Sequence, residues 1–141
     1  MSEEPVISDE LESLLNVEFG PEVYEIEKGM VRKFAEAIGD PNPLWQRVAP
    51  PTFPAALVPT GLLHKMVTAK SPLTRLLNGS NELEYLQPIR VGDVISVSAR
   101  LEKLRKMEGK EGKTLFMILG ITYKNQRGEV VATGRSTFIR Y

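Results

Sequence analysis

The feature that most constrains the fold of this chain is a strongly apolar stretch over residues 53–67, which strand-like segments follow. Pro59 divides the stretch, and a proline inside a helix costs about 3 kcal/mol. Two readings follow: one kinked helix that begins at Thr52, or an extended piece followed by a helix that begins at Thr60. The cost of the proline favours the second. In both readings the helix is apolar on most sides, which predicts that it is buried.

Segments with the pattern of β-strands follow this helix. The clearest has polar residues alternating with Ile95, Val97, Ala99 and Leu101, and the other candidates are residues 80–87, 115–123 and 130–141. Turn-forming residues at 109–112 and 125–128 separate them. Long antiparallel strands after one apolar helix predict an α+β fold, with an antiparallel sheet wrapped around a central helix. Such a sheet leaves edges, so we expect pairing between subunits.

The part of the chain before the apolar stretch predicts a strand, a helix and a stiff loop. Residues 23–26 suit a short strand, and helical spacing of apolar residues predicts a helix over 28–38 that ends at Gly39. Six of the ten prolines lie between residues 41 and 59, which indicates an extended loop. Residues 1–20 are expected to be a mobile extension, in which Ser8 caps a possible short helix.

The composition excludes several classes of function. The 141 residues carry 18 basic and 18 acidic side chains, whereas a nucleic-acid binder usually has a basic excess. No apolar run is long enough to span a membrane, and the acidic N-terminus does not resemble a signal peptide. There is no cysteine and only one histidine, so we expect no metal site, no cofactor and a cytoplasmic location.

Three segments together resemble the MaoC-like hot-dog family of (R)-specific enoyl-CoA hydratases and 3-hydroxyacyl dehydratases. They are residues 37–45, residues 48–54 leading into 59–62, and residues 82–93. Each segment alone is weak, but their order and spacing make the resemblance fairly specific, and it spans roughly residues 22–141. The resemblance implies a single hot-dog domain over residues 21–141.

The first segment resembles the hydratase motif of the family, Gly-Asp-x-Asn-Pro-x-His, with one difference. Asp40 and Asn42 stand at the motif's acidic and amide positions, which makes them the candidate catalytic residues. In the family, the Asp and the His hold the water that adds to a conjugated thioester. The histidine position is Trp45 here, and an indole has only an N–H donor, so it cannot shuttle protons.

His64 is the one possible replacement for that histidine. Measured along a helix that begins at Thr52, it lies roughly 18 Å from the helix start, which is too far to act there. Measured from Thr60 it lies only roughly 6 Å away, so distance alone does not exclude it.

The resemblance implies that a backbone amide at the start of the buried helix polarises the thioester carbonyl, with a small residue that lets the substrate approach. Gly61 fits that description, and the substrate-binding candidates are Trp45, Thr52, Phe53, Gly61 and Tyr85. Two readings stay open for Gly61, because a helix capped by Thr60 needs the same geometry. For Trp45 and Tyr85, packing is the commoner role of such aromatic residues.

Other candidate residues have simpler structural readings, which we favour. Asp40 suits a turn between a helix-ending glycine and a proline, and residues 90–93 suit a turn at the start of a strand. A basic group could meet a CoA phosphate, but nearby acidic residues favour a solvated hairpin; the group comprises Lys103, Arg105, Lys106 and Lys110.

The change to Trp45 resembles the non-catalytic half of heteromeric dehydratases. We therefore expect a subunit of an (R)-specific enoyl-CoA hydratase or 3-hydroxyacyl-thioester dehydratase. It would bind the acyl chain of an acyl-CoA or an acyl-carrier-protein thioester and rely on a second MaoC-like chain for the catalytic Asp and His, in a homodimer or heterodimer. The alternatives are a self-sufficient thioesterase that uses Asp40 or Glu82 to activate water, and a non-catalytic acyl-thioester-binding protein.

Overall fold

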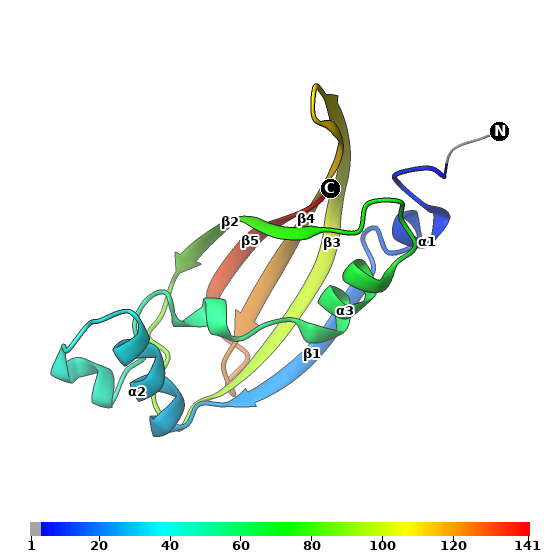
Figure 1. Ribbon diagram of the computed structural model, residues 1–141. Helices are drawn as coiled ribbons and strands as arrows, with labels where there is room; N and C mark the ends of the chain where they lie inside the picture. Colours follow the sequence, from blue (N-terminus) through cyan, green and yellow to red (C-terminus); the bar gives the residue numbers. More distant parts are fainter. Residues whose placement is uncertain (1–3) are drawn as a thin grey trace.

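A five-stranded antiparallel sheet and one helix across its face form the centre of the computed structural model, which describes residues 4–141 (Figure 1). The sheet order is β1-β3-β4-β5-β2, and all neighbouring strands are antiparallel. The strands are β1 Glu18–Glu25, β2 Leu76–Tyr85, β3 Val94–Gly109, β4 Gly112–Lys124 and β5 Val130–Arg140. The helix is α3, Thr60–Thr68, and the predicted α+β fold is confirmed.

The core lies between α3 and the sheet because the central strands alternate between buried and exposed side chains. On β3, the apolar residues that the sequence placed on one face are all buried, from Ile95 to Leu101. Their neighbours on β4 continue the same layer; they are Leu115, Met117, Leu119, Ile121 and Tyr123. Burial of this single face fixes the register of the two strands, since a slip of one residue would expose it.

The proline argument places the start of α3 correctly, at Thr60 directly after Pro59. Residues Phe53–Ala56 form a short 3-10 helix, η2, rather than an extended piece. The expectation that α3 is buried on most sides is wrong for one face. Leu62 and Met66 are buried against the sheet, whereas His64 and its neighbours at helical spacing, Thr60 and Thr68, are exposed.

The helices before the proline loop agree with the sequence. α2 spans Lys28–Ala37, and α1 spans Asp9–Glu12 with the Ser8 hydroxyl accepting the Leu11 N–H at 3.2 Å. Val6 and Leu11 are buried, so this segment packs against the core; the first three residues lie outside the described part. Inside the proline loop, Pro43–Gln46 form a second 3-10 helix, η1, where an extended chain was expected.

The edge strands differ most from their predicted boundaries. β1 begins at Glu18 rather than at residue 23, and β2 covers residues 76–85 rather than 80–87. β1 contains a register shift between Phe19 and Glu22, and nearly all of β2 is exposed, so neither strand has a regular apolar alternation. Their lengths are set by pairing with β3 and β5, which are distant in the sequence.

Arg140, at the end of β5, caps the C-terminal end of α3. Its guanidinium donates to the carbonyl oxygens of Met66 at 3.2 Å, Ala69 at 2.8 Å and Leu73 at 3.1 Å. A cation is favoured at this end of a helix dipole. Burial lowers the pKa of the Arg140 guanidinium, and the charge of Glu10 opposes that shift.

Within residues 4–141, no helix combines the length and the apolar character that crossing a membrane requires.

Candidate functional site

The loop that follows α2 is built by side chains that bond to their own backbone. Gly39 has a positive φ of 69° after the helix, and the Asp40 N–H donates to the Ala35 carbonyl at 3.0 Å. The Asp40 carboxylate accepts the Asn42 N–H at 3.1 Å, and the Asn42 side-chain oxygen accepts the Leu44 N–H at 3.0 Å. Both residues therefore form the local turns typical of Asx side chains. This geometry agrees with the structural reading of Asp40.

Trp45 lies beside Asp40 in this loop. Together with Asn42, they line a hollow of about 340 Å³ between α2 and the proline loop. The indole ring packs partly into the core, and its N–H is buried without a hydrogen-bond partner in the described residues. An indole donates a hydrogen bond but neither accepts nor transfers a proton. Asp40 and Trp45, at the acidic and histidine positions of the motif, therefore line the same hollow, but they do not form an acid–base pair.

The start of α3 is occupied by a carboxylate from β1. The Gly61 N–H donates to Glu22 Oε2 at 3.2 Å, and the Thr60 hydroxyl donates to the other oxygen, Oε1. No local side chain caps the helix, which Pro59 precedes. An anion is stabilised at this end of a helix by the unpaired N–H groups and the dipole. The Gly61 amide is therefore paired with Glu22 in the isolated chain.

Gly61 is not required by the packing of this chain. A Cβ added there would meet nothing nearer than Glu22 Oε2, at 4.0 Å. Glycine within a helix is less favourable than alanine, so neither packing nor helix stability accounts for a glycine at this position. Gly61 is exposed to solvent, and the direction in which a side chain would point is open.

His64 does not join the loop of Asp40. Its side chain is exposed on α3, and within residues 4–141 its ring makes no hydrogen bond. It is absent from the lining of the hollow that Asp40 and Trp45 share. The structure does not place His64 where it could act with Asp40.

The remaining substrate-binding candidates have different surroundings. Phe53 is buried and meets the Phe34 ring edge-on, with 5.4 Å between the ring centroids, whereas Thr52 is exposed. The Tyr85 hydroxyl accepts the Ile89 N–H at 2.8 Å and donates to the Ala49 carbonyl at 3.5 Å. Burial raises the pKa of Tyr85, and the bond from Ile89 partly offsets that rise. Phe53 and Tyr85 therefore have packing roles that account for their positions.

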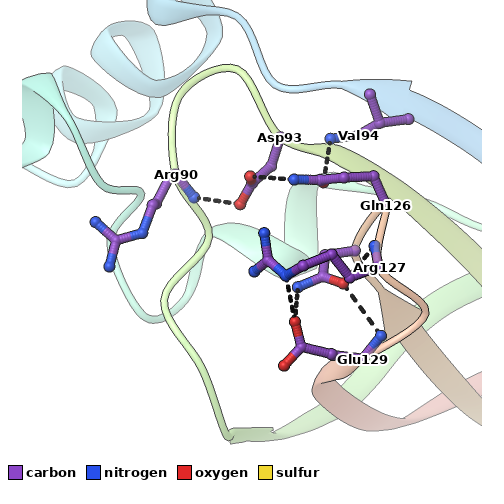
Figure 2. Close-up of polar contacts among 7 residues, drawn as sticks. Arg90, Asp93, Val94, Gln126, Arg127 and Glu129 are labelled. Carbon is purple, nitrogen blue, oxygen red and sulfur yellow. Dashed lines mark hydrogen bonds and ion pairs between the residues drawn. The ribbon is translucent and has the colours of Figure 1, made fainter.

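The turn at residues 90–93 is structural, as the sequence indicated (Figure 2). Asp93 is buried, and its carboxylate accepts the Arg90 N–H at 2.8 Å and the Gln126 side-chain N–H at 3.0 Å. Gln126 in turn accepts the Val94 N–H at 3.0 Å. These bonds fasten the entry of β3 to the turn between β4 and β5.

The basic group lies on the β3–β4 hairpin, which projects from the sheet at the end opposite α2 (Figure 1). Its four members are exposed, and none makes an ion pair within residues 4–141; they are Lys103, Arg105, Lys106 and Lys110. Lys106 shares a hollow with Glu4 and Glu12 of the N-terminal segment. The two carboxylates considered for a thioesterase, Asp40 and Glu82, lie apart. Glu82 is exposed on β2 and lines a different hollow from the one that Asp40 lines.

Glu22 and Arg140 are the two site residues that the sequence did not reveal. Each acts on α3 from a strand, and 39 residues separate Glu22 from the Gly61 amide that it accepts from. The register shift in β1 that positions Glu22 falls on Gly20-Pro21, which signals an irregular strand but not its contact with α3. Among the described residues, no group of three His, Cys, Asp or Glu side chains is placed to hold a metal ion.

Comparison with known proteins gives consistent similarities. A family model described as "FAS1-like, dehydratase domain region" matches residues 13–134. The chain is 31% identical over 127 residues to a UPF0336 protein of Thermobifida fusca, covering 80% of this chain and 81% of that protein. It is 28% identical over 141 residues to a probable enoyl-CoA hydratase alpha subunit of Thermomonospora curvata, covering 79% of this chain and 44% of that protein.

Solved structures share the fold at low sequence identity. The C-terminally truncated HadBC complex of Mycobacterium tuberculosis, a (3R)-hydroxyacyl-ACP dehydratase, superposes with a TM-score of 0.73 at 16% identity, covering 89% of this chain and 96% of that chain. A MaoC-like dehydratase superposes with a TM-score of 0.75 at 21% identity, covering 92% of this chain and 42% of that chain.

Proposed function

This chain belongs to the FAS1-like dehydratase-region family and has the MaoC-like hot-dog fold, and on that premise we propose that it is the non-catalytic subunit of a heteromeric hydratase or dehydratase. In this role it binds the acyl chain of a thioester and relies on a second MaoC-like chain for the catalytic Asp and His. The observation that carries the proposal is Trp45, at the position where the family motif has histidine.

Hydration of a conjugated thioester needs one group to take a proton from water and another to supply one to the α-carbon. Trp45 can do neither, because an indole has no accessible acceptor. One Asp40 oxygen accepts the Asn42 N–H within a turn, and His64 is exposed on a separate element. The chain therefore offers one carboxylate but no acid–base pair at the loop.

Two of the similar proteins support the proposal that this chain works with a second subunit. One is described as an alpha subunit of a probable enoyl-CoA hydratase, and the other belongs to a complex described as a dehydratase that acts on a 3-hydroxyacyl-ACP. By analogy, the substrate of a complex containing this chain is an enoyl or 3-hydroxyacyl thioester. We propose an acyl-CoA or an acyl-carrier-protein thioester, since both present the same reacting group.

The edge of β2 is the surface that we propose for the partner. Edge strands present unpaired backbone groups to another chain, and prolines and bulges blunt them. β1, the other edge, contains Pro21 and a register shift, whereas β2 has no proline and exposes Leu76 and Leu77 at 44% and 51%. β2 also has one irregularity, at residues 78–80, but its two leucines favour association.

Assay of hydration of crotonyl-CoA tests the proposal. We expect no turnover by the purified chain alone, and turnover when a MaoC-like chain with an intact Asn-Pro-x-His motif is added. Replacing the histidine of that added chain should lower turnover by about 10²–10⁴-fold, the usual contribution of a general acid or base. Asp40→Ala in this chain should leave turnover of the complex nearly unchanged. Robust turnover by the chain alone, lost in Asp40→Ala, would refute a non-catalytic role.

A further inference from the structure

The carboxylate at the start of α3 bears on where a thioester can be polarised. Glu22 accepts the Gly61 N–H at 3.2 Å and a hydrogen bond from the Thr60 hydroxyl. These are two of the donors at the first turn of the helix, and the Gly61 amide is the one that family resemblance assigns to the thioester oxygen. An internal anion thus stands where a substrate oxygen would have to bind.

The sheet, rather than the helix, holds Glu22 in this position. Glu22 lies on β1 opposite Val97 of β3, a fully buried position, so its side chain points to the α3 side of the sheet. The register shift between Phe19 and Glu22 precedes it directly. Because β1 pairs with β3 on both sides of that shift, the carboxylate is positioned without any contribution from a substrate.

A carboxylate competes strongly for a helix amide. Hydrogen bonds to an ionised acceptor are roughly twice as strong as bonds between neutral groups, and the helix dipole adds to the preference. A thioester oxygen is a neutral acceptor before the reaction. To reach the Gly61 N–H it must displace a charged group that is already bonded to both Gly61 and Thr60.

Packing does not close the same position. A Cβ on Gly61 would have no neighbour nearer than 4.0 Å, and that neighbour is the Glu22 carboxylate itself. Gly61 is also exposed to solvent. Removal of the carboxylate would therefore leave the amide without its partner at a residue that is exposed to solvent.

The geometry points to Glu22 as the residue that closes the carbonyl-binding position of this subunit. A pair formed by this chain and a catalytic MaoC-like chain then polarises one thioester carbonyl rather than two, at the helix start of the catalytic chain. This inference rests on the proposed function. By blocking the carbonyl-binding position of this chain, Glu22 would determine that the thioester reacts in the catalytic subunit.

Nuclear magnetic resonance of the isolated chain tests this inference, with the Gly61 backbone amide as the reporter. The probe is S-crotonyl-N-acetylcysteamine, a small neutral thioester. In the wild-type chain we expect the Gly61 amide signal to stay unchanged as the probe is added. In Glu22→Ala we expect a saturable shift of that signal. Glu25→Ala is the matched control, since Glu25 lies exposed on the same strand and should behave as the wild type.

Two results would overturn the inference: a Gly61 shift in the wild-type chain equal to that in Glu22→Ala, or no shift in Glu22→Ala. If Glu22→Ala does not fold, Glu22→Gln replaces it, since glutamine keeps the length and an acceptor but has no charge; a saturable shift is still expected. No step of this test depends on turnover or on a partner. Its failure is therefore distinct from failure of the crotonyl-CoA assay.

Discussion

Arg140 and Glu22 hold the two ends of α3 with charges that match the helix dipole. Glu22 bonds to the first turn, and Arg140 donates to three carbonyl oxygens at and beyond the last turn. Both residues belong to strands, so the position of α3 is fixed by the sheet. A third residue, Trp45, affects the chemistry rather than the fold, because the only indole of the chain stands where proton transfer would need an imidazole.

Arg140→Met should destabilise the chain by about 3 kcal/mol, since hydrogen bonds to a charged group contribute about 1.5–3 kcal/mol and buried carbonyls would lose their donor. Thermal or urea unfolding measures the change. Arg135→Met is the matched control on the same strand: its side chain is 61% exposed and its ion pair with Glu102 spans 3.8 Å. The control should lose less than about 1 kcal/mol. Equal losses in the two variants would contradict the capping role.

Among the helices and strands, the sequence predicts those whose position is determined by residues within the element or next to it. β3 follows from the alternation of Ile95 to Leu101 because one face of the strand is buried, and α3 begins where the cost of Pro59 places it. β1 and β2 are edge strands whose ends depend on distant partners, so their boundaries were misplaced.

The candidate site divides in the same way. The turn of Asp40 and the missing histidine at Trp45 can be read from seven consecutive residues. The bond between Glu22 and Gly61 joins positions 39 residues apart, and Gly20-Pro21 marks the register shift beside Glu22 without identifying the distant partner. Long-range contacts of this kind need the folded arrangement of β1 against α3.

The β2 edge can be tested against the β1 edge with one substitution on each. Leu77→Lys should weaken association of the chain with itself or with a catalytic partner, because an edge lysine opposes strand pairing. Both positions are more than half exposed, Leu77 at 51% and Val23 at 61%, so folding should be little affected. Sedimentation equilibrium measures the association. The opposite pattern, with Val23→Lys as the damaging change, would move the interface to β1.

For the whole molecule, buried tyrosines make stability sensitive to alkaline pH. Burial, with a smaller contribution from Tyr24, raises the pKa of Tyr123 from 10.0 to about 12. A raised pKa means that the folded state keeps the proton longer than the unfolded state. The contribution of Tyr123 to stability is therefore complete below pH 10.0 and is lost as the pH rises toward about 12.

The free energy of unfolding should fall by up to about 1.4 kcal/mol per pH unit over that range for this one group. Urea unfolding at a series of alkaline pH values measures it. In Tyr123→Phe the free energy of unfolding should fall less steeply with pH. Some dependence on pH should remain, because the pKa values of Tyr24 and Tyr85 are also raised. An unchanged slope in Tyr123→Phe would show that Tyr123 ionises no later in the folded chain.

The sheet order also has a consequence for how the protein is made. β3, β4 and β5 are consecutive in the chain and adjacent in the sheet, so they can pair as the ribosome releases them. β2 precedes them, yet its one neighbour in the sheet is β5, residues Val130–Arg140. A nascent chain shorter than that has no template for β2. The proposed docking edge is thus absent during synthesis of the rest of the domain, which delays assembly until β5 has emerged.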